Sequence, residues 1–131
     1  MTKVNITNLA AVTDAAFQRE YQKLRPLLEA EAHIQKQLSN LDAQVAEVRA
    51  GCSDTDGYRV TGTDVLWGSW ESATRRQLNM ELARNRSQKI TAMDALKLAF
   101  GKKQAVASLS QRLRKKHQSL QQRALLEQLY F

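Results

Sequence analysis

The sequence of 131 residues is poor in the residue types that interrupt or cross-link a chain. It contains one cysteine, one proline and five glycines, and only 6% of its residues are aromatic. A single cysteine excludes an intramolecular disulfide framework and a structural zinc module built on several cysteines. The glycines and the proline are too few for the many tight turns of a β-sandwich or a β-barrel. These absences favour a helical protein whose core is built mostly from Leu, Ala and Val.

Long apolar runs are also missing. No stretch approaches the ~20 apolar residues that a membrane-spanning helix needs. Residues 1–16 carry one lysine and no apolar run of the length found in a signal peptide. Because Cys52 is the lone cysteine, the sequence predicts a protein of the reducing cytoplasm.

Apolar residues recur with a heptad period over residues 13–50, which we predict to form one helix. The two positions of the repeat are occupied by Phe17, Leu24, Leu38 and Val45, and by Leu27, Ile34, Leu41 and Val48. This repeat is typical of a coiled-coil seam, which a single helix cannot bury. We expect Thr13 to cap the helix at its start and Gly51 to cap it at its end.

Three residues do not fit this seam, namely Glu20, Glu31 and Pro26. Proline inside a helix lacks an amide hydrogen and clashes with the preceding turn, at a cost of ~3 kcal/mol. Because the apolar pattern resumes in register at Leu27, we expect the helix to kink at Pro26 and not to break there.

Residues 51–63 hold three of the five glycines together with Ser, Asp and Thr residues, and we predict that they form a loop. We predict that residues 64–129 form a second and longer helix. Its expected apolar stripe comprises Trp67, Trp70, Ala73, Leu78, Leu82, Ile90, Met93, Leu96 and Phe100. Beyond Gly101 the apolar residues continue in a shifted frame, which predicts a stutter or a bend there.

The predicted fold class is therefore all-α. The 131 residues are expected to form one domain, an antiparallel two-helix coiled-coil hairpin with a glycine-rich loop. The second helix is expected to extend past the first, which would expose leucines and basic residues at its end.

The basic residues are concentrated in the second half of the chain. Residues 1–62 carry 7 basic and 8 acidic side chains and a net charge of −1, whereas residues 63–131 carry 13 basic and 5 acidic side chains and a net charge of +8. One basic cluster comprises Arg75, Arg76, Arg84, Arg86 and Lys89. The other comprises Lys102, Lys103, Arg112, Arg114, Lys115 and Lys116.

No pattern of residues indicates an enzyme. The sequence has no glycine-rich phosphate loop and no nucleophile elbow. His33 and His117 fall on different predicted helices without the spacing of metal ligands. We therefore predict no catalytic residue, no cofactor and no metal site.

The pair Trp67 and Trp70 has two interpretations. Three residues apart on a helix, both tryptophans share one face. They could close the hairpin by packing on Val45 and Val48, or they could anchor a partner, because tryptophan is enriched at interaction hot spots.

The heptads from Phe17 to Val48, the stretch RRQLNMELARNRSQK (Arg75–Lys89) and the stretch AFGKKQAVASLSQRLRKK (Ala99–Lys116) make the chain similar to the FliJ/YscO family. These proteins are the small coiled-coil stalks of flagellar and type III secretion export. The resemblance implies an antiparallel coiled coil that sits in the hexameric export ATPase, contacts the export gate and helps secretion chaperones. It also implies a place at the cytoplasmic face of a membrane export complex.

The resemblance further implies that the basic cluster of the second helix faces the ATPase ring. Arg75, Arg76, Arg84 and Arg86 would pair with carboxylates of the ring, with Lys89 completing the cluster, and Trp67 and Trp70 would anchor the tip.

Two other functions stay open from the sequence. The basic clusters could bind nucleic acid, with an affinity that falls steeply as salt rises. No recognition motif or stacking aromatic accompanies them, which makes an acidic protein partner the favoured alternative. The chain could also be a general scaffold or oligomerisation module whose seam pairs between chains.

Overall fold

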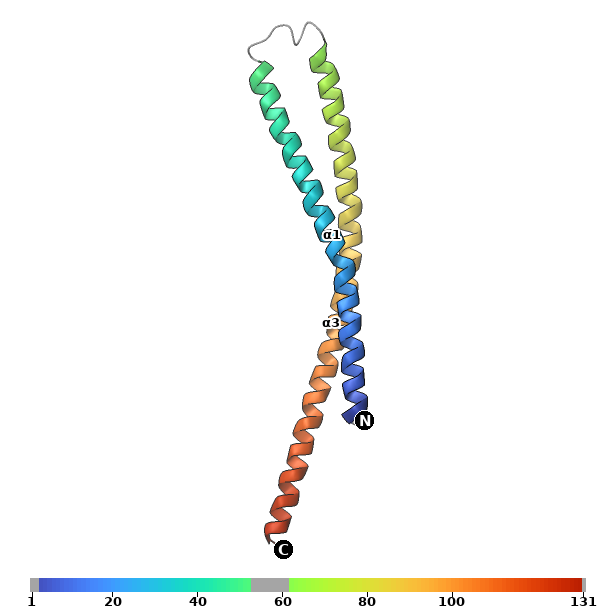
Figure 1. Cartoon of the computed structure of the whole chain (residues 1–131), viewed down its shortest axis with the longest axis vertical. Helices are drawn as coiled ribbons and strands as arrows, with labels where there is room; N and C mark the ends of the chain where they lie inside the picture. The colour runs from blue at the N-terminus through green and yellow to red at the C-terminus, as the bar shows by residue number, and fades with distance from the viewer. Residues whose placement is uncertain (1–2, 53–61, 131) are drawn as a thin grey trace. The chain divides into compact units, whose positions relative to one another are not determined.

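The computed structural model describes residues 3–52 and 62–130, and it contains two helices (Figure 1). Helix α1 (Lys3–Cys52) has 50 residues and helix α3 (Thr63–Tyr130) has 68 residues. The described ranges contain no strand. The two helices pack against each other as a hairpin, which confirms the predicted all-α class.

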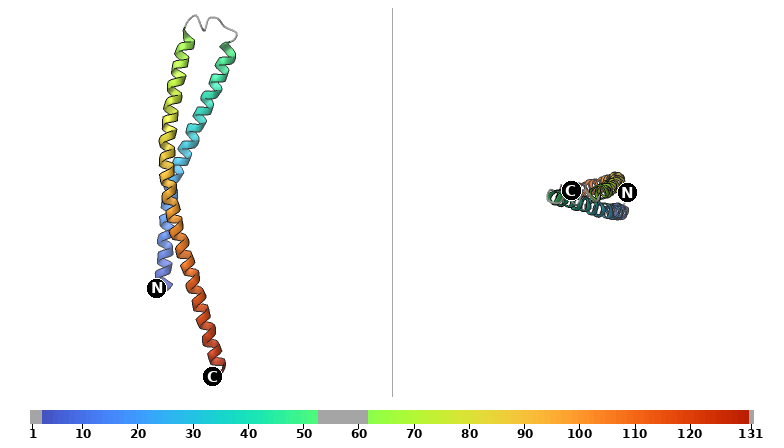
Figure 2. Two further views of the ribbon diagram at one scale, coloured as in Figure 1. Left: turned by 180° about the vertical axis from the view of Figure 1, so that it is seen from behind. Right: turned by 90° about the horizontal axis from the view of Figure 1, so that it is seen from above.

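The chain forms two compact units, and both helices contribute to each of them. One unit comprises Met1–Lys23 and Ala92–Phe131, and the other comprises Leu24–Thr91. In the first unit, the blue start of α1 lies beside the orange part of α3 (Figures 1 and 2). We refer to them as the 1–23/92–131 unit and the 24–91 unit.

Contacts between side chains show that the helices are antiparallel in each unit. In the 24–91 unit, Glu31 pairs with Arg86 and Asp42 pairs with Arg75. A step of 11 residues forward along α1 thus matches an equal step back along α3. In the other unit, Asp14 pairs with Lys103, and three residues further along α1 the ring of Phe17 contacts that of Phe100. The predicted antiparallel pairing is confirmed within each unit.

The predicted seam of α1 is the face that packs against α3. In the 24–91 unit, Ile34, Leu41 and Leu78 form a buried cluster, against which Leu38 and Leu82 pack. Leu24 is buried as well, and the other residues of both predicted heptad positions are half-buried. Since a heptad repeat keeps one stripe of a helix facing its neighbour, the spacing alone was sufficient to find this core.

The start of α1 differs from the prediction. The helix begins at Lys3 and not at residue 13, so Thr13 does not cap it. Thr13 is buried inside the helix, and its hydroxyl lies 3.0 Å from the carbonyl oxygens of both Leu9 and Ala10. Ile6, one heptad before Thr13, is also buried. The seam therefore extends to Ile6, and the polar Thr13 concealed its continuation in the sequence.

Helix α1 continues through Pro26 to Cys52, which confirms that the helix does not break at this proline. Gly51 lies within the helix and not beyond its end. The predicted loop falls mostly outside the described residues, apart from its ends. Gly62 has a φ of 70°, which favours glycine, and its carbonyl accepts a hydrogen bond of 3.2 Å from the Leu66 amide as α3 begins.

The face of α3 that packs against α1 also differs from the prediction. In the 24–91 unit it includes the buried residues Leu78 and Asn85, and in the other unit it includes Ala99 and Val106. Each pair is spaced by seven residues, and the second pair spans Gly101 without a shift of frame. Of the two alternatives predicted at Gly101, the stutter is therefore wrong, and the bend stays a prediction.

Five residues of the expected stripe of α3 are exposed instead, Trp70 and Ala73 among them. Ile90 is 62% exposed, Met93 36% and Phe100 47%. The face that packs against α1 includes the half-buried Lys89 and Lys103, whose ammonium groups reach Glu31 and Asp14 of α1. The face of α3 that packs against α1 is thus complementary to α1 in charge. Hydrophobicity alone does not identify this face.

Candidate partner-binding surface

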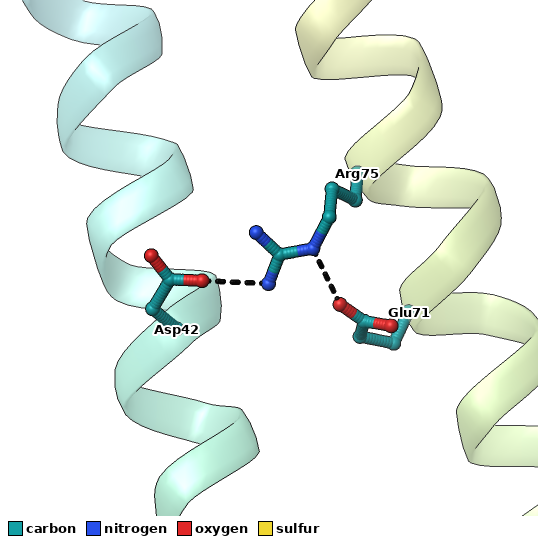
Figure 3. A network of polar contacts seen from close by, with 3 residues as sticks. All are labelled: Asp42, Glu71 and Arg75. Carbon is teal, nitrogen blue, oxygen red and sulfur yellow. Dashed lines mark hydrogen bonds and ion pairs between the residues drawn. The ribbon is translucent and has the colours of Figure 1, made fainter.

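Arg75 is held between two carboxylates within the 24–91 unit (Figure 3). Its Nη2 lies 2.6 Å from Oδ1 of Asp42 on α1, and its Nε donates to Oε1 of Glu71 at 2.7 Å. The hydrogen bond to Glu71, followed by that to Asp42, raises the pKa of Arg75 above its ordinary value. Arginine is charged at all physiological pH values in any case. The consequence is geometric, because the pair with Asp42 holds the guanidinium against α1 while Glu71 fixes it from its own helix.

Glu31 of α1 binds two further cations of the predicted site. Its Oε2 lies 2.9 Å from Nζ of Lys89, and its Oε1 lies 3.8 Å from Nε of Arg86. The side chain of Glu31 is only 14% exposed, so this ion pair is better shielded from solvent than a typical surface pair. Glu31, which interrupts the apolar repeat of α1, thus supplies the negative charge that pairs with the cations of α3.

These pairs divide the predicted basic cluster into two groups. Arg75, Arg86 and Lys89 are neutralised by carboxylates of the same chain. Arg76 and Arg84 are exposed, and neither forms an ion pair with any of the described residues. Only these two arginines of the cluster are therefore available to a partner without breaking a contact inside the hairpin.

The two tryptophans lie together at the start of α3. Their ring centroids are 6.4 Å apart and the rings are tilted by 46°. Trp67 is half-buried, whereas Trp70 is 51% exposed. Of the pair, Trp70 offers the larger apolar surface to a partner.

One outward face of α3 combines these features. Arg76, Met80 and Arg84 follow one another at intervals of four residues, which places them on a single face of the helix. Met80 is 48% exposed, and Trp70, two heptads before Arg84, lies at the edge of this face that Arg84 occupies. We refer to Trp70, Arg76, Met80 and Arg84 as the outward patch of α3.

Met80 was not among the residues predicted from the sequence. The signal that could have found it is its position midway between two arginines on one helical face. An exposed methionine beside cations is well suited to protein contact, because its flexible thioether adapts to irregular surfaces. The outward patch therefore joins two free charges to two large apolar side chains.

Within residues 3–52 and 62–130 no group of three or more His, Cys, Asp or Glu residues is placed to hold a metal ion. Neither of the two described helices has a stretch long and apolar enough to cross a membrane.

Comparisons with protein-family models, with curated proteins and with solved structures found no match to this chain.

Proposed function

We propose that this protein acts by contact, without catalysis, as a stalk or chaperone-escort component of a bacterial flagellar or type III protein export apparatus. It would work at the cytoplasmic face of the membrane export complex. Its partner would be the export ATPase ring, with the export gate and secretion chaperones as further partners. The similarity to the FliJ/YscO family carries the choice of apparatus, and the helical hairpin is the architecture that this similarity implies.

The observation that supports a contact function best is the division of the basic cluster. Arg75, Arg86 and Lys89 hold α3 to α1, whereas Arg76 and Arg84 extend outward. Charges on a protein surface steer and orient a partner of opposite sign, and exposed Trp and Met side chains supply apolar anchors. The outward patch therefore suits an acidic protein surface that carries apolar pockets.

This division refines the site expected from the sequence. The cations of the hairpin seam stabilise the hairpin, and the cations of the outward patch bind the partner. Trp70 anchors the contact, and Trp67 supports its ring from the side.

The test is a pulldown of the purified export ATPase with the full chain. The double variant Arg76→Glu/Arg84→Glu should lose most of the binding, whereas Lys97→Glu/Lys102→Glu, which changes the net charge equally on exposed residues of α3, should retain it. Circular dichroism should show the same helicity for both variants. Binding that survives the reversal at Arg76 and Arg84 would exclude the outward patch as the contact surface.

A chain that fails to bind the ATPase, the export gate and the chaperones would refute the export proposal itself. Binding to a short DNA duplex with a steep dependence on salt would instead support a nucleic-acid function. Sedimentation as a dimer would support the scaffold function, in which the seam pairs between chains.

A further inference from the structure

The last part of α3 carries a helix face that no other described residue covers. Every residue from Arg114 to Tyr130 is exposed. The preceding part of α3 in the 1–23/92–131 unit packs against α1, and Val106 is buried there. We refer to residues 114–130 as the uncovered segment.

A groove lies where α1 begins and the uncovered segment emerges. Its volume is about 460 Å³, and its apolar lining comes from Ile6 of α1 and from Leu113 and Leu120 of α3. Arg114 and Lys116 line the same groove. Thr7, Ser110 and His117 also belong to the polar lining, and no Asp or Glu is among the lining residues. The groove therefore combines an apolar floor with charged side chains of positive sign only.

The apolar floor belongs to the same stripe that packs against α1. Val106, Leu113 and Leu120 follow one another at intervals of seven residues. Val106 is buried and Leu113 is half-buried, whereas Leu120 is 54% exposed. The seam of α3 therefore continues in register to Leu120, past the point where α1 stops covering it, and a second helix could extend the packing there without any change of frame.

The charges that flank this stripe indicate the chemistry of such a helix. Arg114, Lys116 and Arg123 lie beside the stripe at the flanking positions of the heptad, where side chains form interhelical ion pairs that set partner choice. The uncovered segment has four basic residues and one acidic residue, Glu127. A helix that packs here needs acidic side chains at its own flanking positions.

In the covered part of α3 in the same unit, a basic side chain at a seam position also pairs with an acid of the opposing helix. Lys103, which lies one heptad before Ser110 of the groove lining, places its ammonium group 3.0 Å from a carboxylate oxygen of Asp14 on α1. There α3 supplies the cation and the opposing helix supplies the acid. The uncovered segment also carries cations, but no described residue lies opposite them to supply the acids.

We propose that the uncovered segment, together with the groove at the start of α1, binds an acidic amphipathic helix of a partner protein. The partner helix would lie along the uncovered segment as α1 lies along the preceding part of α3. Its apolar stripe would pack on Leu113 and Leu120. Its carboxylates would pair with Arg114, Lys116 and Arg123. The proposal does not depend on the export function, because it involves a different surface and a different test.

A second copy of this chain fits the segment poorly. Pairing two uncovered segments would set Arg and Lys side chains against each other, and like charges at flanking positions oppose association. DNA and anionic membranes would be attracted by the charge, but neither needs a leucine stripe in heptad register.

Two neighbouring lysines make a matched test on the full-length chain. Lys116 lines the groove, whereas Lys115 does not and falls on another face of the helix. The probe is a fluorescein-labelled acidic peptide with Leu at the two seam positions and Glu at the flanking positions, about three heptads long because shorter helices are marginal. Its binding is measured by fluorescence anisotropy, and the same peptide with Lys in place of Glu serves as its counterpart.

The acidic peptide should bind and the lysine peptide should not. Lys116→Glu should weaken the binding about threefold to tenfold, as expected for one ion pair lost and one repulsion gained, whereas Lys115→Glu should leave it within about twofold. Leu120→Gln should weaken it about tenfold or more, the equivalent of one apolar side chain. Leu129→Gln, an exposed leucine on the opposite face, should have no such effect, and circular dichroism should show equal helicity for all four variants.

Equal losses for Lys115→Glu and Lys116→Glu, or binding that ignores Leu120→Gln, would overturn the proposal. A short DNA duplex or phosphatidylserine vesicles that bind more tightly than the peptide, and equally well to the Leu120→Gln variant, would assign the segment to an anionic polymer or a membrane instead. Sedimentation as a dimer that Leu120→Gln converts to a monomer would assign it to a second copy.

Discussion

Lys103 of α3 contacts Asp14 of α1 by an ion pair of 3.0 Å, and the same ammonium group lies over the ring of Phe17, 4.9 Å from its centroid. Phe17 in turn contacts Phe100, with 5.9 Å between the ring centroids. A single lysine thus joins a charge contact and an aromatic contact between the two helices of this unit. A lysine at a seam position can thus contribute contacts to the neighbouring helix where apolar residues are few.

We expect Lys103→Ala to lower the free energy of unfolding by about 1 kcal/mol, since it removes an exposed ion pair and a cation–π contact, each worth a fraction of that value. The measurement is urea unfolding followed by circular dichroism. Lys102→Ala is the control, because Lys102 is exposed at the preceding position of the helix and should change the stability by less than about 0.5 kcal/mol. Equal effects of the two variants would mean that the contacts of Lys103 add nothing to stability.

We expect Leu41→Ala to lower the free energy of unfolding by about 2–4 kcal/mol, the range for truncating a buried leucine. Leu41 is 4% exposed and belongs to the buried cluster of the 24–91 unit. Leu66→Ala provides the comparison, because Leu66 is 72% exposed and its truncation should cost less than about 0.5 kcal/mol. Thermal unfolding of the two variants side by side decides the matter, and a Leu66 effect as large as that of Leu41 would contradict the assigned core.

Asn85→Leu should raise the free energy of unfolding by about 1 kcal/mol or more, because a buried polar group without a partner is costly. Asn85 is 7% exposed, and no group among the described residues forms a hydrogen bond with its Oδ1. A buried asparagine in a coiled-coil seam can instead fix the register and the number of chains at a cost in stability.

The effect on register is testable with the same variant. Sedimentation of Asn85→Leu should show a larger share of oligomers than the wild-type chain, whereas the exposed substitution Asn79→Leu should not change the distribution. A variant that is less stable than the wild-type chain would show that Asn85 has a partner in solution.

Gly101→Ala should raise the free energy of unfolding by about 0.5–1 kcal/mol, because alanine loses less backbone entropy than glycine in the interior of a helix. A methyl group at this position would meet no atom within 4 Å. Gly62→Ala is the counterpart, since the same methyl group finds open space there but the φ of 70° disfavours any side chain. Opposite changes in melting temperature are therefore expected, and a loss of stability at Gly101 would indicate that the helix does not continue through this residue.

The seam of α1 could be predicted from the sequence because its residues are mostly large and apolar and recur every seven positions. Leu24, Ile34 and Leu41 needed no knowledge of their partners to be assigned to the core. The N-terminal part of the same helix was missed because Thr13, a polar residue that usually caps or interrupts helices, occupies a core position. Its hydroxyl donates a hydrogen bond to carbonyl oxygens of its own helix, and no pattern of hydrophobicity reveals this.

The candidate site was predicted as a cluster, and its division was not. Arg75 and Arg76 are adjacent and chemically alike in the sequence, yet Arg75 binds Asp42 and Glu71 while Arg76 faces solvent. Asp42 is 33 positions away from Arg75 in the sequence, so local spacing carries no information about their contact. Only the packing of the two helices decides which cation is used inside the hairpin.

The sequence by itself determined that this protein is helical, that α1 has one apolar face and that α3 carries the excess positive charge, because helical period and charge are local properties of the chain. The tertiary structure decided which face of α3 is buried. Ile90 is more hydrophobic than Lys89, yet Lys89 lies in the seam and Ile90 is exposed. The reason is that burial of a face is settled by the fit of two helices together, and Glu31 of α1 forms an ion pair with a lysine that it could not form with an isoleucine.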